Sequence, residues 1–272
     1  MYAAIDFGLT NTDIAYAAER DSAPRFLFIP SGPELNVRAV ERALRATGQP
    51  LEAFVRVAVT GGQHRRLPAV VAGAELVKVN EVEAIGRGGL ALSNHEAALV
   101  VSAGSGTACV AARQSVHQHI SGSAVGGGTL LGLSRLLLNT TDPLAIDRLA
   151  QAGDANAVDT TLIEAVGGEI GRLPADTNAV NFGKVEHAAT LPRREDIAAG
   201  LARMIGQTIG IIAANAARAE GLEDAVFIGR LMELVTIRKA VLEVARVYGL
   251  DDHFRLPPKP GSGTVLGAFR SL

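Results

Sequence analysis

The chain has 272 residues, of which 48% are hydrophobic and 20% charged, so it can bury a substantial core. Its formal net charge of −2 argues against nucleic acid as the main partner, and the single cysteine, Cys109, excludes an intrachain disulfide or a multi-cysteine zinc site. The start of the chain lacks the basic region of a signal peptide, and we find no apolar run of the ~20 residues that a membrane span needs. We therefore expect a cytoplasmic protein without membrane contact.

The N-terminal part shows the alternating pattern of strands. A first strand ends near Asp6 and is followed by a turn rich in Gly, Thr and Asn. The predicted order is strand, strand, strand, helix, strand, over Tyr2–Phe7, Asp13–Ala17, Arg25–Ile29, Leu35–Thr47 and Phe54–Val59. This order is that of a ribonuclease-H-like lobe.

The next segment predicts a helix start. An apolar run, Ala74–Val79, precedes Asn80, which can cap a helix with Glu83 at the third position in a capping box. We expect that helix to end near Gly86 or Leu90.

The pattern of the first lobe then recurs after about ninety residues. Strands are predicted at Ala97–Val101, Thr107–Ala112 and Val116–Ile120, with a glycine turn at Gly104–Gly106 between the first two. The predicted fold class is therefore α/β with two ribonuclease-H-like lobes, residues 1–95 and 96–272.

Further elements complete the second lobe. We predict an apolar helix after Gly126–Thr129, a strand at Ala225–Ile228, and helices at Pro143–Gln151, Val158–Val166, Arg194–Glu220 and Leu231–Tyr248. The loop Gly261–Gly263 leads into a short final helix.

Two glycine-bearing loops stand out chemically. Gly104–Thr107 follows a strand, and Gly126–Thr129 opens a helix. Loops of this kind leave backbone N–H groups free and let a phosphate approach closely. A plain hairpin turn is the alternative interpretation of the first loop, and close helix packing is that of the second.

Eight short motifs follow one another in a fixed order. They are Ile5–Thr10, Thr60–Gly62, Asn80–Glu83, Ser102–Thr107, Ser121–Thr129 with Leu131–Leu133, Asn181–Gly183, Val226–Gly229 and Gly263–Gly267. In this order they resemble type II pantothenate kinases, members of the actin/sugar-kinase/Hsp70 ATPase superfamily. The match covers most of the chain, and Ser121–Thr129 is its most specific part.

The resemblance implies an actin-like ATPase fold with a nucleotide cleft between the lobes, ATP and Mg²⁺, a small-molecule acceptor, and a homodimer formed through the 194–220 helix or its surroundings. Its nucleotide-binding positions are Asp6, Gly8, Thr10, Asn11, Gly104, Ser105, Gly106, Gly126, Gly127, Gly128, Thr129, Gly229 and Gly263. Its acceptor-binding positions are Glu81, Ser105, His119 and Ser121, and Asp6 would hold Mg²⁺ through water. The implied reaction is phosphorylation of pantothenate in coenzyme A biosynthesis.

Glu81 is the residue that we predict to act as general base. An acceptor hydroxyl needs a carboxylate within hydrogen-bond reach while it attacks the γ-phosphorus. Glu83 is expected to close the helix cap instead. The alternatives are that Glu81 only complements the helix dipole and that Asp6 only stabilises its turn.

Four positions depart from the family pattern. Leu9 replaces a glycine, Asp13 a lysine, His119 the arginine that helps hold pantothenate, and Arg230 a small residue. These departures leave three alternatives open: a kinase for a different acceptor, a nucleotide-binding activator or regulatory ATPase, and a scaffold that has lost ATP binding.

Overall fold

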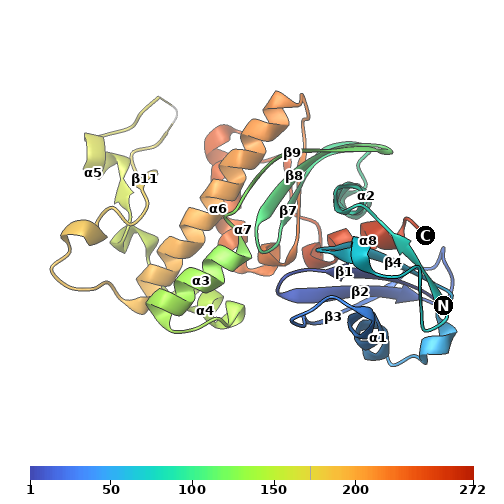
Figure 1. Cartoon of the computed structure of the whole chain (residues 1–272). Helices are drawn as coiled ribbons and strands as arrows, with labels where there is room; N and C mark the ends of the chain where they lie inside the picture. The colour runs from blue at the N-terminus through green and yellow to red at the C-terminus, as the bar shows by residue number, and fades with distance from the viewer. Residues whose placement is uncertain (172) are drawn as a thin grey trace.

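A computed structural model describes residues 1–171 and 173–272. Two mixed β-sheets, each with helices against it, form the body of the molecule (Figure 1). The first sheet has the strand order β3-β2-β1-β4-β6-β5. Its strands are β1 (Tyr2–Phe7), β2 (Asn11–Ala17), β3 (Arg25–Pro30), β4 (Arg56–Gly61), β5 (Val70–Val71) and β6 (Ala74–Lys78), and α1 (Val37–Ala46) packs on it.

The second sheet has the order β13-β12-β7-β8-β9. Its strands are β7 (Ala97–Ala103), β8 (Thr107–Arg113), β9 (Val116–Ser123), β12 (Ala225–Ile228) and β13 (Phe254–Arg255). The remaining long helices are α3 (Gly127–Leu138), α4 (Pro143–Ala152), α6 (Arg194–Ala219) and α7 (Val235–Tyr248), which belong to this half, and α2 (Glu81–Ser93) and α8 (Gly263–Phe269), which pack against each other. A small pair, β10 (Thr160–Thr161) and β11 (Asn178–Val180), projects with α5 (Leu162–Val166) from the side of α6 (Figure 1).

Each main sheet is apolar on both faces because successive side chains along a strand point to opposite sides. In the first sheet, Ile5 and Val59 face α1, whereas the small side chains of Ala4 and Ala58 face α8. In the second sheet, Leu99, Cys109 and Phe227 face α6, whereas Val100, Val110 and Ile228 face α2. The helices α2 and α8 therefore lie between the two sheets.

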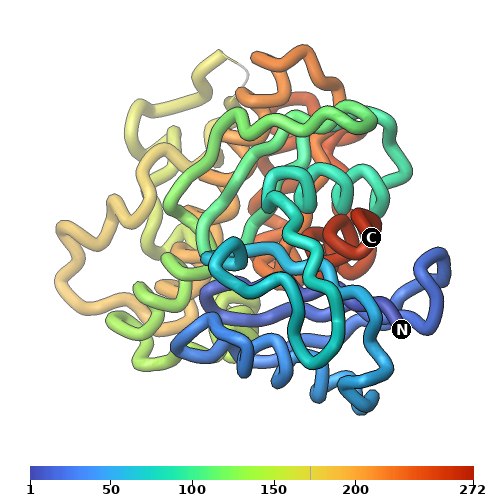
Figure 2. Tube along the Cα trace, turned by 45° about the vertical axis from the view of Figure 1, so that its right-hand side comes forward, coloured from blue at the N-terminus to red at the C-terminus, as the bar shows by residue number. Residues whose placement is uncertain are grey.

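The crossing of α2 and α8 brings backbone against backbone. A Cβ atom added to Gly267 would clash with the carbonyl oxygen of Ala84 and would lie 2.6 Å from the amide nitrogen of Gly88. A Cβ added to Gly88 would in turn clash with the carbonyl oxygen of Gly263. In Figure 2 the C-terminal helix α8, in red, lies between the blue N-terminal strands and the blue-green coil of α2. Glycine is required here by close approach, since it alone has no Cβ.

We expect Gly267→Ala to lower the free energy of unfolding by about 1–3 kcal/mol, because the two helix backbones must move apart to accept the methyl group. The matched control is Gly132→Ala on the exposed side of α3, where an added Cβ meets nothing within 4 Å. That control should gain about 0.5–1 kcal/mol from the better helix propensity of alanine. Urea unfolding followed by circular dichroism measures both, and equal stability of Gly267→Ala and the wild type would contradict the packing.

The helix α6 carries much of the core of the C-terminal half. It is long and apolar enough to cross a bilayer by length and composition alone, yet 56% of its most apolar window is buried inside the molecule. Ile205 and Ile209 on this helix are fully buried, and the helix packs against α3, α4 and α7. Its apolar face therefore serves the fold of its own chain.

The predicted helix at Val158–Val166 is wrong. Thr160 and Thr161 pair with β11, and only the five residues of α5 are helical. Thr161 accounts for the late start, since its backbone N–H donates to the Glu164 carboxylate 2.9 Å away and its hydroxyl does so at 2.8 Å. Similarly, α7 begins at Val235 and not at Leu231, because residues 230–233 form a 3₁₀ turn and Asp147 accepts from the amide of Val235.

Candidate active site between the two sheets

A polar row crosses the first sheet at the ends of its central strands. Asp6 on β1 is paired in register with Asp13 on β2 and with Thr60 on β4. Directly paired residues project to the same face of a sheet, and this face is the one that α8 covers further along. Gly61 follows with φ +86°, and a Cβ there would lie 2.7 Å from Asp6 Oδ1. The glycine thus leaves the Asp6 carboxylate room.

The electrostatics of Asp6 are those of a crowded acid. Its pKa is raised from 3.8 to about 7, chiefly by burial and then by the carboxylates of Asp13 and Glu81, while the guanidinium of Arg230 lowers it. The influence of Glu81 places two predicted site residues, from β1 and from the start of α2, in one electrostatic neighbourhood. A bound cation would relieve this excess of negative charge.

Glu81 occupies the first position of α2. The side chain of Asn80 caps the helix by accepting from the amide of Val82 at 2.9 Å. The predicted capping box is wrong, because Glu83 pairs with Arg87 at 2.6 Å one turn along the same helix. Glu81 is exposed and takes no part in the cap, so its carboxylate is available to a ligand.

The turn after β1, residues 8–11, and the loop after β7, residues 104–106, are both predicted to bind phosphate, and they meet each other. Thr10 Oγ1 and Ser105 Oγ lie 3.4 Å apart, although the loops belong to different sheets. The first loop is closed by the amide of Gly8, which donates to the carbonyl of Asn11 at 3.1 Å. The second is closed by the amide of Gly104, which donates to the carbonyl of Gly106 at 2.9 Å. Residues that follow β1 and β7, from the two sheets, therefore meet in one rim.

The start of α3 is bound to the second loop. The amides of Gly127 and Gly128 donate to the carbonyls of Gly104 and Ser105, at 2.8 Å and 2.9 Å. A Cβ on Gly126 would lie 2.7 Å from the carbonyl oxygen of Ser105, so close packing requires glycine there. These two N–H groups, which the sequence assigned to phosphate, are satisfied by the chain itself.

Thr129, which follows Gly127 and Gly128 at the start of α3, is bound to the preceding chain through its side chain. Thr129 Oγ1 accepts from the amide of Gly126 at 3.2 Å and donates to the carbonyl of Ala124 at 3.2 Å. The hairpin and the start of α3 thus form one unit, and their role in phosphate binding stays a prediction.

The predicted acceptor residues on β9 are separated by a bulge. His119 pairs with Val110 and Ser121 with Cys109, so Ile120 between them has no partner on β8. Ser121 is half-buried, whereas His119 is exposed and shares a strand face with His117, whose ring lies against α2. His119 makes no hydrogen bond or ion pair with another side chain of residues 1–171 or 173–272.

The two glycines predicted on the adenosine side have different settings. Gly229 ends β12 with φ +99°, and its amide donates to the carbonyl of Pro260 at 2.8 Å. A Cβ there would clash with the carbonyl oxygen of Ala103, at the end of β7. Gly263 is buried, and a Cβ on it would lie 2.8 Å from Ile228. Both glycines are required by close packing, and their role in nucleotide binding stays a prediction.

The donor set around Asp6 suits Mg²⁺ held by one carboxylate. Within the residues that the structure describes, no three His, Cys, Asp or Glu side chains are grouped to hold a metal ion. Mg²⁺ commonly binds through one or two carboxylates, water and substrate phosphates. The buried hydroxyl of Thr60, without a hydrogen-bond partner in the described chain, lies beside Asp6. Asp6 would hold the ion, and the ion would neutralise phosphate charge.

A contact that the sequence did not predict joins the two halves. Arg230, directly after Gly229, forms an ion pair and hydrogen bond with Asp13, and its guanidinium carbon lies 3.7 Å from the centre of the Phe28 ring. The signal was present in the sequence as two separate departures from the family pattern, of opposite charge. Only the fold shows that they meet.

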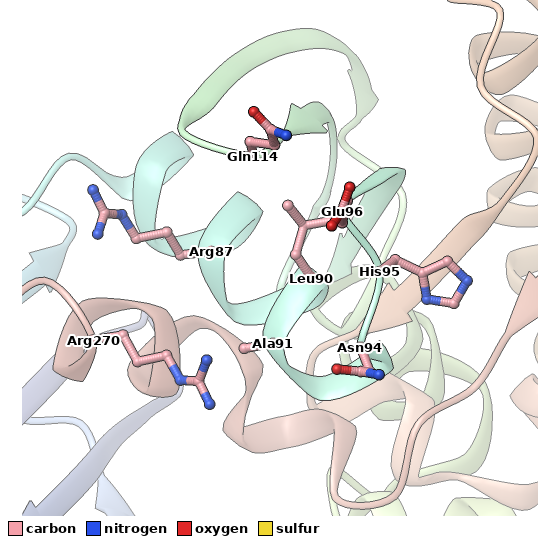
Figure 3. A pocket seen from close by; sticks show the side chains of 8 residues that line it. All are labelled: Arg87, Leu90, Ala91, Asn94, His95, Glu96, Gln114 and Arg270. Carbon is pink, nitrogen blue, oxygen red and sulfur yellow. The ribbon is translucent and has the colours of Figure 1, made fainter. Parts of the chain in front are cut away.

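A pocket of about 650 Å³ lies elsewhere, where the end of α2 meets β7, β8 and the end of the chain (Figure 3). It is lined by Arg87, Leu90, Ala91, Asn94, His95, Glu96, Gln114 and Arg270. None of these is a predicted site residue. In Figure 3 the side chains of Arg87 and Gln114 extend away from each other.

Residues 91–248 match the model of the Fumble family. The chain belongs to the Fumble family. This match covers more than half of the chain and includes the second phosphate loop, the start of α3 and β12.

Relatives of this Fumble-family chain confirm the resemblance to type II pantothenate kinases. A type II pantothenate kinase of Bacillus cereus (strain ATCC 10987 / NRS 248) is 25% identical over 231 residues, which are 83% of this chain and 81% of that protein. Another, from strain G9842, is 25% identical over 180 residues, 64% of this chain and 66% of that protein. Pantothenate kinase 1 of Oryza sativa subsp. japonica is 37% identical over 137 residues, 48% of this chain and 20% of that protein.

Solved structures confirm the predicted fold class. The activator of the 2-hydroxyisocaproyl-CoA dehydratase from Clostridium difficile, solved with bound ADPNP, superposes with a TM-score of 0.68 at 16% identity and covers 99% of this chain and 93% of its own. A ROK hexokinase from Thermus thermophilus gives 0.55 at 15% identity, covering 98% and 96%. The Fumble-family chain thus has the actin-like ATPase fold.

Proposed function

We propose that this protein is an ATP- and Mg²⁺-dependent kinase that transfers the γ-phosphate to an acceptor hydroxyl, and that the acceptor is pantothenate. The observation that carries the proposal is that the carboxylate of Glu81, at the start of α2, acts electrostatically on the carboxylate of Asp6, on β1. The rim that Thr10 and Ser105 form between the two sheets supports it. The relatives named type II pantothenate kinase support the acceptor. A cytoplasmic homodimer belongs to the same proposal.

Each carboxylate has one task in this reaction. Asp6 holds the metal ion that neutralises the phosphates when it is bound. Glu81 accepts the proton of the acceptor hydroxyl as that oxygen attacks the γ-phosphorus, and ADP leaves. Thr10 and Ser105, which meet across the rim, limit the access of water to the transferred phosphate.

The decisive experiment is a coupled assay of ADP release with and without pantothenate, together with mass spectrometry of the product. We expect ADP release to depend on pantothenate, because a kinase site suppresses transfer to water until the acceptor is in place. The product should be heavier by one phosphoryl group. Release of ADP with another alcohol but no phosphorylated pantothenate would overturn the acceptor and leave the kinase class.

Asp13 favours a second candidate, a nucleotide-dependent activator or regulatory ATPase. Its carboxylate lies beside Asp6 and adds negative charge where a nucleotide phosphate would bind. Such a protein would hydrolyse ATP at the same rate with or without any small acceptor. The same coupled assay separates the two candidates, since the kinase requires an increase of the rate on adding acceptor.

A further inference from the structure

The side chain of Arg230 connects the two halves of the molecule. It belongs to the 3₁₀ turn after β12 in the second sheet, and it reaches Asp13 and Phe28 on the first. Asp13 and Phe28 are direct partners in the β2–β3 register, so both project to the same face, toward the guanidinium. The carboxylate binds the guanidinium at its edge and the ring supports it from one face.

Arg230 is a single cation among acids. Of the charged groups that act on Asp6 in the described part of the chain, Asp13 and Glu81 are acidic and Arg230 is the cation. Glu233 adds a further acid, 3.5 Å from Arg230 Nη1. Polyphosphate entering this neighbourhood meets carboxylates on several sides and requires a positive partner besides the metal ion.

The guanidinium has donors that the protein does not use. Its Nη2 donates to Asp13 and its Nη1 forms an ion pair with Glu233, so each terminal nitrogen keeps an N–H that these contacts do not require, and its buried Nε has no hydrogen-bond partner within residues 1–171 and 173–272. The side chain keeps 24% of its surface exposed, so a ligand can reach it. A guanidinium carries five N–H donors in a planar fork that matches two phosphate oxygens.

We infer that Arg230 binds a phosphate group of the nucleotide, and that Asp13 and Phe28 hold its guanidinium in place before the nucleotide arrives. This inference rests on the proposed nucleotide-dependent function and names a residue of that site. Asp13 plays two opposing parts, because it positions Arg230 and yet competes with phosphate for it. The two members of one ion pair therefore have opposite effects on nucleotide affinity.

A purely structural ion pair gives a different result. If the contact only fixed the angle between the two halves, removing either partner would break the same link and would change nucleotide affinity in the same direction. The direction of change in the two single variants thus decides between the two roles.

The test is calorimetric titration of a non-hydrolysable ATP analogue with Mg²⁺ into the wild type, Arg230→Ala, Arg230→Lys and Asp13→Asn. Arg230→Ala should raise Kd by about 10- to 100-fold, because it removes charge-assisted hydrogen bonds to phosphate. Arg230→Lys should fall between it and the wild type, since it keeps the charge but loses the fork. Asp13→Asn, which keeps the shape of the side chain, should lower Kd.

Two controls separate phosphate binding from general damage. Arg255, on β13, also forms an ion pair with an aspartate, since its Nε lies 3.1 Å from Asp224, and Arg255→Ala should leave Kd unchanged. Competition by adenosine, which has no phosphate, should be the same in Arg230→Ala as in the wild type. The inference is overturned if Kd shifts in the same direction in Arg230→Ala and Asp13→Asn, or if it shifts in neither. If Arg230→Ala does not fold, the same comparison is made between Arg230→Lys and Asp13→Asn.

Failure of this inference differs from failure of the proposed function. A wild type that binds the analogue but does not phosphorylate pantothenate overturns the acceptor, and the opposite shifts of the two variants still support Arg230. A wild type that binds no analogue overturns both.

Discussion

Glu81→Gln is expected to lower kcat by about 10²–10⁴-fold with little change in nucleotide affinity, because it removes the carboxylate that we propose as the acceptor of the hydroxyl proton. The amide keeps the size of the side chain, and Asn80 still caps α2 through its own side chain. Helix stability should thus be nearly unchanged. Steady-state kinetics with saturating acceptor measures kcat, and calorimetry with an ATP analogue measures affinity.

The matched control for this prediction is Glu83→Gln, two residues along the same helix. Glu83 pairs with Arg87 and contributes an exposed helix pair worth about 0.3–0.5 kcal/mol, so its replacement should leave kcat within a few-fold of the wild type. An equal loss of kcat in both variants would show that activity depends on negative charge at the start of α2 and not on a general base at Glu81. Full activity of Glu81→Gln would remove Glu81 from the mechanism.

Asp6→Asn is expected to have opposite effects on activity and on stability. Loss of the carboxylate that we propose to hold Mg²⁺ should lower turnover with Mg²⁺ and ATP by at least about 100-fold. The ligand-free protein should nevertheless become more stable at pH 8, because the variant no longer holds a desolvated carboxylate beside Asp13 and Glu81. For a half-buried group the gain is roughly 1–3 kcal/mol after allowance for solvent screening.

The pH dependence of this gain has a definite sign. The pKa of Asp6 is about 7 in the folded protein against 3.8 for an aspartate side chain in water, so the folded state binds more protons between these values. The wild type therefore loses stability as pH rises from about 4 to about 7, and the variant does not share that loss. Thermal melts should show the difference in Tm growing across this window and levelling off above it.

Two controls accompany the Asp6 experiment. Asp21→Asn removes the same charge at an exposed turn and should change neither Tm nor turnover. Mg²⁺ with the ATP analogue should raise the Tm of the wild type and have a much smaller effect on Asp6→Asn. A variant less stable than the wild type at pH 8 would show that the carboxylate is satisfied in the ligand-free protein, contrary to its pKa.

Most of the regular elements could be predicted from the sequence because their patterns are local. Short apolar runs bounded by turn residues indicated β1, β7 and β8, and helical spacing together with length indicated α6. The failure at residues 158–166 has a local cause that patterns do not capture, since Thr161 pairs with β11 and caps a short helix at once. A helix-like spacing there was overridden by contacts with residues further along the chain.

The residues of the candidate site were proposed one by one from motifs, and their roles stay predictions, whereas the contacts that join them could not be predicted from the sequence. The positions of Asp6 and Glu81 followed from motifs, whereas the pairing of Arg230 with Asp13 joins residues 217 positions apart. The hydrogen-bond acceptors of the first α3 amides could not be predicted either, because glycine permits the close approach of a bound phosphate and of a backbone carbonyl alike. In the structure, Gly127 and Gly128 donate to the chain itself.

The position of α8 between the sheets has a consequence for the order in which the chain can fold during synthesis. The alanine face of the first sheet, with Ala4 and Ala58, is covered by Val265 and Phe269, which the ribosome adds some two hundred residues later. Until then this face of the earliest strands is open to water and to chaperones. The first sheet, although first to be translated, is among the last parts of the molecule to be sealed.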